Sequence, residues 1–138
     1  MGTRGQISLE YLIVVAFVVF AVIVIMGVSL FYTSSAQDQI KISQLSAFAN
    51  KIVTSAESVY YAGEPSKITI SAYLPKGVQD IQIISNSIVF TMVTSSGTTV
   101  IAFESNVPLD DSTVFSINEG LKRIVVNAGA DRVYVAES

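Results

Sequence analysis

A single long apolar run limits what this chain can fold into. From Tyr11 to Tyr32 every residue is apolar apart from Gly27 and Ser29. About 20 such residues are enough for a helix to cross the hydrocarbon core of a bilayer. Val and Ile, modest helix formers in water, are common in this run, but in hydrocarbon a lone segment satisfies its backbone hydrogen bonds only as a helix. The run therefore predicts a transmembrane helix over about residues 11–32.

The residues after this run continue a helical pattern, but with only one apolar side. Apolar residues recur at three- and four-residue spacing with polar residues between them; they are Leu45, Phe48, Ala49, Ile52, Val53, Ala56, Val59 and Tyr60. Nothing interrupts the pattern before Gly63 and Pro65, which form a typical helix stop. We therefore expect one helix over residues 6–62 that is amphipathic over about 38–61.

From Lys67 onward the apolar residues alternate with polar ones, as they do in strands. Short β-rich runs are separated by turn residues, and these runs cover residues 67–74, 78–84, 87–94, 98–104, 113–117, 121–127 and 132–136. Without helices between them, they predict a small antiparallel β-sheet or β-sandwich over residues 66–138, and an α+β fold for the chain. A β domain of this size builds only a small core alone, so we expect it to pack on the amphipathic helix.

The chain contains no cysteine and no histidine. It therefore lacks the thiolate and imidazole groups that commonly serve as nucleophiles, general bases and metal ligands. Residues 33–138 carry seven Lys or Arg against ten Asp or Glu, and this mildly acidic balance offers no basic surface for phosphates. We expect no enzymatic activity, no cofactor, no metal and no nucleic-acid partner.

Three weaker patterns have simple structural explanations. Asp110 and Asp111 follow a proline and are typical turn residues, and no calcium-loop spacing accompanies them or Glu104. The pair Lys122-Arg123 fits a strand edge better than a binding site. For the tyrosines we expect packing between helix and sheet rather than an adhesive patch; they are Tyr60, Tyr61 and Tyr73.

The segment before the apolar run carries the most specific signal. Glu10 heads the expected membrane helix, where a charge has to lie at the interface or find a partner because its burial is costly. Cleavage after Gly5 would create such a partner, the new α-amine of Gln6. That amine would lie one helical turn from Glu10 of its own chain, and in a packed bundle a neighbouring copy's carboxylate could reach it instead. The basic residue Arg4 before the run indicates that this end stays on the cytoplasmic side.

Gln6, Ser8 and Glu10, preceded by Arg4-Gly5 and followed by an apolar helix, resemble the amino terminus of archaeal type IV pilins with class III signal peptides, whose motif is QxSxE. The resemblance covers residues 4 to about 32, and Val14 stands where the family often has leucine. It implies that residues 1–5 are a leader removed by a prepilin peptidase. Gly5 would be the last leader residue, Gln6 the mature amino terminus, Glu10 the assembly carboxylate and Ser8 a further motif residue.

The resemblance also implies a function. Subunits of this family are held in the membrane until they are processed, and their apolar helices then stack into a helical homo-oligomeric filament on the cell surface. Such pili serve adhesion and surface contact. We therefore expect a structural subunit without catalytic residues.

Two other interpretations remain open. The chain could be an uncleaved, single-pass membrane-anchored surface protein with a β-sheet binding ectodomain, and processing at Gly5 would distinguish it from a pilin. A secretory signal peptide cut after Ala36 would have small residues at Ser34 and Ala36. However, the apolar region of that peptide would be about 22 residues long, against a usual length of about 7–15.

Overall fold

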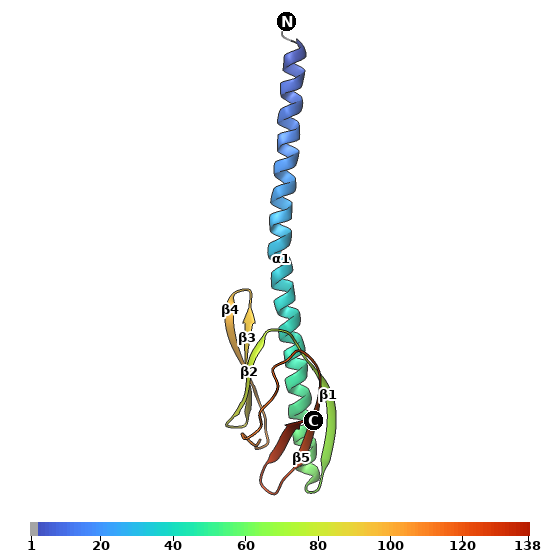
Figure 1. The fold of residues 1–138 in the computed structure, drawn as a ribbon, viewed down its shortest axis with the longest axis vertical. Helices are drawn as coiled ribbons and strands as arrows, with labels where there is room; N and C mark the ends of the chain where they lie inside the picture. The colour runs from blue at the N-terminus through green and yellow to red at the C-terminus, as the bar shows by residue number, and fades with distance from the viewer. Residues whose placement is uncertain (1–2) are drawn as a thin grey trace. The chain divides into compact units, whose positions relative to one another are not determined.

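The computed structural model describes residues 3–138, which form one long helix followed by six strands (Figure 1). Met1 and Gly2, the first two residues of the expected leader, lie outside the described residues. The elements are α1 (Thr3–Ala62), β1 (Lys67–Leu74), β2 (Val78–Ile84), β3 (Ser87–Thr94), β4 (Gly97–Glu104), β5 (Gly120–Ala128) and β6 (Val133–Glu137). The chain divides into two units, one ending at Gln37 and a compact one formed by Asp38–Ser138. The predicted α+β class is confirmed.

Helix α1 ends where the sequence predicts. Gly63 adopts a left-handed backbone conformation with φ of 78°. Its N–H donates to the carbonyl oxygens of Val59 and Tyr60, at 3.0 and 3.2 Å. These bonds satisfy carbonyls that have no partner within a helix end, and glycine adopts the required conformation without strain.

The strands form two antiparallel sheets of three strands each, in the orders β1-β5-β6 and β2-β3-β4. The second sheet is a meander with two-residue turns. The first turn consists of Ser85 and Asn86, which have positive φ angles of 47° and 68°, as the twist of a tight hairpin requires. In the other sheet, β1 pairs along its whole length with β5, from Lys67 opposite Asn127 to Leu74 opposite Gly120.

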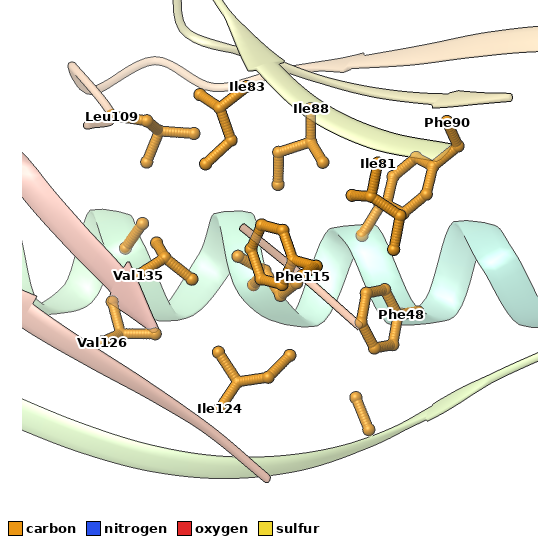
Figure 2. Close-up of a cluster of buried hydrophobic side chains, with 14 of the residues drawn as sticks. Phe48, Ile81, Ile83, Ile88, Phe90, Leu109, Phe115, Ile124, Val126 and Val135 are labelled. Atoms are coloured by element: carbon orange, nitrogen blue, oxygen red, sulfur yellow. The ribbon is translucent and has the colours of Figure 1, made fainter. Parts of the chain in front are cut away.

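Both sheets pack on the carboxyl-terminal half of α1, and their inner side chains join the helix stripe in one core (Figure 2). Phe48 on the helix packs edge to face on Phe90 of β3, with 6.0 Å between ring centroids. From the other side, β5 contributes Ile124 and Val126, which are fully buried. The expectation that the β domain builds its core on the helix stripe is therefore confirmed.

One predicted strand does not form, since residues 113–117 have no regular structure. Side chains satisfy hydrogen-bonding groups in this region: the Thr113 hydroxyl donates to the Val135 carbonyl, and the Ser116 N–H donates to the Glu137 carboxylate at 2.8 Å. Only Phe115 enters the core, while Val114 is 88% exposed. Because the segment is held by these contacts and presents a single core side chain, it does not join a sheet.

Candidate functional site

The residues predicted for processing and assembly lie in the first turns of α1. Residues 4–10 are helical and exposed. Gln6 and Glu10 are four positions apart, so they lie on the same side of the helix. Ser8 lies halfway between them in sequence and therefore points to the opposite side. The structure thus brings Gln6 and Glu10 onto one face and leaves Ser8 on the other.

Gly5 lies in this helical segment at a position where the fold does not require glycine. A Cβ atom added there would meet no other atom within 4 Å, and the backbone is not in the left-handed region. Alanine would favour the helix over glycine by up to about 1 kcal/mol. The described fold therefore gives no reason for a glycine at this position.

The backbone around Gly5 is also easy to unwind. The first four N–H groups of a helix have no acceptor within the helix. No acidic residue in the first turn of α1 compensates for them by interacting with the helix dipole. Opening the segment from Arg4 to Gln6 therefore breaks fewer hydrogen bonds than opening a turn in the interior of α1, because only the carbonyl groups of these residues have partners within the helix.

The helix beyond Glu10 exposes apolar side chains on all sides. Phe17 is 71% exposed and Phe31 is 73% exposed. An 18-residue window of α1 reaches a mean hydropathy of 3.1, and none of that window is buried within residues 3–138. The helix is long and apolar enough to cross a membrane. Such a continuous apolar surface is unfavourable in water and marks a site covered by lipid or protein.

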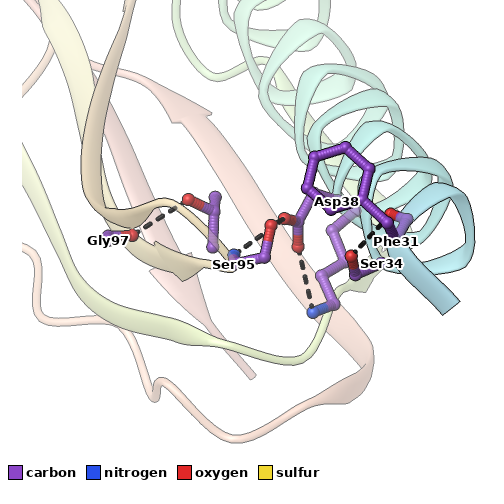
Figure 3. Close-up of polar contacts among 7 residues, drawn as sticks. Phe31, Ser34, Asp38, Ser95 and Gly97 are labelled. Atoms are coloured by element: carbon purple, nitrogen blue, oxygen red, sulfur yellow. Dashed lines mark hydrogen bonds and ion pairs between the residues drawn. The ribbon is translucent and has the colours of Figure 1, made fainter. Parts of the chain in front are cut away.

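The compact unit has a polar contact at its first residue (Figure 3). The carboxylate of Asp38 accepts hydrogen bonds from the hydroxyl and the N–H of Ser95, the latter at 2.7 Å, and lies 3.5 Å from the Lys41 ammonium group. The bond from the Ser95 hydroxyl, followed by that from its N–H, lowers the pKa of Asp38. Sequence analysis missed this contact because the two residues are 57 positions apart and neither belongs to a recognisable motif.

The acidic and basic pairs considered above form structural contacts within residues 38–138. The expectation of a strand edge for Lys122-Arg123 is wrong, because the pair lies on β5, the central strand of its sheet. Asp110 is buried and pairs with Arg132 at 3.5 Å, while Asp111 is exposed. Lys122 donates to the Ser116 hydroxyl and to Glu137, both at 3.0 Å. Within residues 3–138, no three Asp or Glu side chains come together as metal ligands.

The expectation for the tyrosines is wrong. Tyr60 and Tyr61 pack on each other with 5.8 Å between their ring centroids, but Tyr61 is 76% exposed. Tyr73 is 48% exposed and borders an open depression together with Phe48 and Lys51. The core between helix and sheets is formed by other side chains, among them Phe48, Phe90 and Phe115.

Comparisons with protein-family models, with curated protein sequences and with solved structures found no match to this chain.

Proposed function

We propose that this chain is a structural subunit of an archaeal type IV pilus-like filament. One observation carries the proposal: an apolar helical surface that is exposed on all sides, headed by the carboxylate of Glu10 and preceded by a glycine that folding does not require. Such a surface is unfavourable for a subunit that stays in water. In a subunit that passes from lipid into a filament it is covered in both places, first by lipid and then by neighbouring helices.

Processing is the first step of the proposed function. A membrane peptidase cuts between Gly5 and Gln6, in the turn of α1 that is easiest to unwind. A small residue before the cut lets the peptidase approach the backbone closely. The product begins with a positively charged α-amine on Gln6, on the same side of the helix as Glu10.

Assembly is the second step. Packing between Val and Ile side chains supplies attraction but little direction, so a polar contact has to fix how far one helix slides along the next. In a dry bundle a carboxylate needs a cationic or hydrogen-bonding partner. The amine of Gln6 in a neighbouring copy is suited to pair with Glu10, and this contact sets the register. The assembled filament lies on the cell surface, where it serves adhesion.

Replacing Glu10 tests the assembly step. Glu10→Ala should leave cleavage and membrane insertion intact and strongly reduce or abolish filaments, because it removes the only Asp or Glu side chain among residues 1–37. The measurement is electron microscopy of surface filaments, with a fractionation immunoblot for mature subunit, in cells that express only the variant. Glu57→Ala is the matched control, since this glutamate on the same helix only accepts an exposed hydrogen bond from Asn106.

Mature Glu10→Ala subunit that accumulates in the membrane without filaments would support the proposal. Abundant normal filaments would show that Glu10 has no role in assembly and that packing alone sets the register between subunits.

A second candidate function is that of an uncleaved, membrane-anchored surface protein. It is favoured by the core of residues 38–138, which is formed by the helix stripe and both sheets without any contribution from the apolar segment. A unit with its own core can serve as a binding ectodomain on a permanent anchor. In that case Gly5 and Glu10 have no role, and the amino terminus stays uncut.

A further inference from the structure

The two sheets have four edge strands, and three of these edges are protected. An edge strand presents unpaired N–H and C=O groups, to which a strand from another chain can bind. Proteins usually block such edges with lysines, bulges or covering segments. Strand β4 is the exception in this chain, and its properties point to a partner.

In the β1-β5-β6 sheet each edge strand has at least one backbone group bonded from outside the sheet. The Lys51 ammonium group donates to the Ser71 carbonyl on β1 at 2.5 Å. On β6, Val133 donates to the Pro108 carbonyl at 2.8 Å and accepts from the Asp110 N–H at 2.9 Å. A lysine thus caps one edge, and the segment after β4 lies along the other.

In the second sheet, the β2 edge is protected by an irregularity and a side chain. The pairing of β2 with β3 shifts between Val78 and Asp80, and such bulges discourage further pairing. The Asp80 carboxylate then accepts the N–H of Ile81 at 2.9 Å and also binds the Gln82 amide. A backbone donor that an incoming strand would need is therefore already occupied.

Strand β4 has none of these protections. It is eight residues long, pairs with β3 without a shift, and contains no proline or lysine. A two-residue turn makes Thr94 and Gly97 a hydrogen-bonded pair, and hydrogen-bonded pairs alternate with non-hydrogen-bonded pairs along the strand. The residues of the second kind turn their N–H and C=O groups away from β3; they are Thr98, Val100 and Ala102. Within residues 3–138 no hydrogen bond reaches these groups.

The side chains around this edge are apolar and incompletely covered. Val100 is 64% exposed on the outer face of the sheet. On the inner face, Ile101 and Phe103 contact the core but are only partly buried. The only charge on β4 is Glu104, at its very end. An uncharged strand with apolar residues on both faces fits this edge best.

We propose that β4 pairs antiparallel with β4 of a second copy of this chain, which joins two three-stranded sheets into one of six strands. On the inner face, Ile101 and Phe103 of the two copies then lie beside each other, because residues opposite one another share a face. Antiparallel pairing also keeps the two Glu104 carboxylates at opposite ends of the joined edge. Pairing of β4 with itself thus brings apolar residues together and keeps like charges apart.

This contact goes beyond the proposed filament. It relates two copies by a twofold axis, so it closes on itself, whereas filament growth needs a contact that repeats from head to tail. The β4 contact therefore joins subunits in pairs, either free in the membrane or on neighbouring filaments. It does not depend on cleavage at Gly5.

Cysteine crosslinking of the full chain in lipid nanodiscs tests the proposal. The chain has no native cysteine, so Val100→Cys places a single thiol on the β4 edge. Gln82→Cys is the matched control, because it places an exposed thiol on the other edge strand of the same sheet. A short bismaleimide should give a covalent dimer with the first variant and little with the second. Equal crosslinking of both, or none with Val100→Cys, would overturn the proposal.

A second pair of variants asks whether backbone bonds carry the contact. In the Val100→Cys chain, Ala102→Pro removes an N–H from the free edge, where proline is tolerated, and Ala102→Ser retains it. Circular dichroism checks that both remain folded. The dimer should be lost with proline and kept with serine. A dimer that survives the proline in a folded chain would contradict strand pairing, as would a partner other than this chain in the crosslinked product.

Discussion

The two halves of α1 belong to one continuous helix but differ in whether the chain itself buries their apolar side chains. In the first half, up to Gln37, nearly every residue is exposed, whereas the second half buries a stripe that includes Leu45 and Ile52 completely. The difference is visible in the sequence as apolar residues on all sides against apolar residues every third or fourth position. A stripe indicates a partner within the chain, and an all-round apolar surface indicates one outside it.

The comparison is sharpest for two phenylalanines. Phe48 is 2% exposed and packs on Phe90, so Phe48→Ala should destabilise the compact unit by about 3–5 kcal/mol through lost burial and a cavity. The measurement is thermal unfolding of the full chain in detergent micelles, followed by circular dichroism of the strands.

The same substitution in the other half is the control. Phe17→Ala, at a residue that is 71% exposed, should leave the unfolding midpoint of residues 38–138 unchanged. An unchanged midpoint with Phe48→Ala as well would show that the stripe faces other subunits rather than its own sheets.

Replacing Gly63, at the end of α1, or Gly27, in its first half, by alanine should change the unfolding midpoint less than Phe48→Ala does. Gly63 has a φ of 78°, so Gly63→Ala should destabilise the helix end by about 1 kcal/mol through strain in the left-handed region. Gly27 has neither a positive φ nor a neighbour within 4 Å of an added Cβ. Gly27→Ala should therefore leave the same unfolding midpoint where it is. A larger loss at Gly27 would reveal a close contact of the apolar half with another helix in the sample.

The smallest effect concerns Asp38, at the first residue of the compact unit. Hydrogen bonds from Ser95 lower its pKa in the folded state. A lowered pKa means that the contact stabilises the fold above the unfolded pKa, and that this contribution disappears as the pH falls through the folded pKa. Asp38→Asn should therefore lower the unfolding midpoint at neutral pH but not at strongly acidic pH. A difference that is independent of pH would contradict this account.

Much of the fold could be predicted from sequence because its elements follow local rules. The helix stop at Gly63 depends on one left-handed residue, and β1 through β5 begin and end within one residue of their predicted bounds. The segment 113–117 was predicted as a strand and is irregular, because Thr113 and Ser116 bind groups more than 20 positions away. Contacts over such distances have no local signature.

For the candidate sites, too, features set by neighbouring residues could be predicted and features set by distant contacts could not. The order of Gly5, Gln6, Ser8 and Glu10 is visible in the sequence, and the helix places Gln6 and Glu10 on one face as their spacing requires. The unprotected edge of β4 could not be predicted, since it depends on which strands lie beside it and on distant residues such as Lys51 and Asp80.

The most direct test of the central claim is mass spectrometry of the amino-terminal peptide of the protein purified from the cells that naturally produce it. If the apolar half of α1 belongs to a processed pilin, the mature chain begins at Gln6, either as glutamine or in its cyclised form. In the cyclised form the neutral lactam N–H, rather than an ammonium group, is the donor available to Glu10. Gly5→Phe should then leave uncut precursor in the membrane. A native chain that begins at Met1, Gly2 or Gln37 would contradict the account and favour a permanent anchor or a secretory signal peptide.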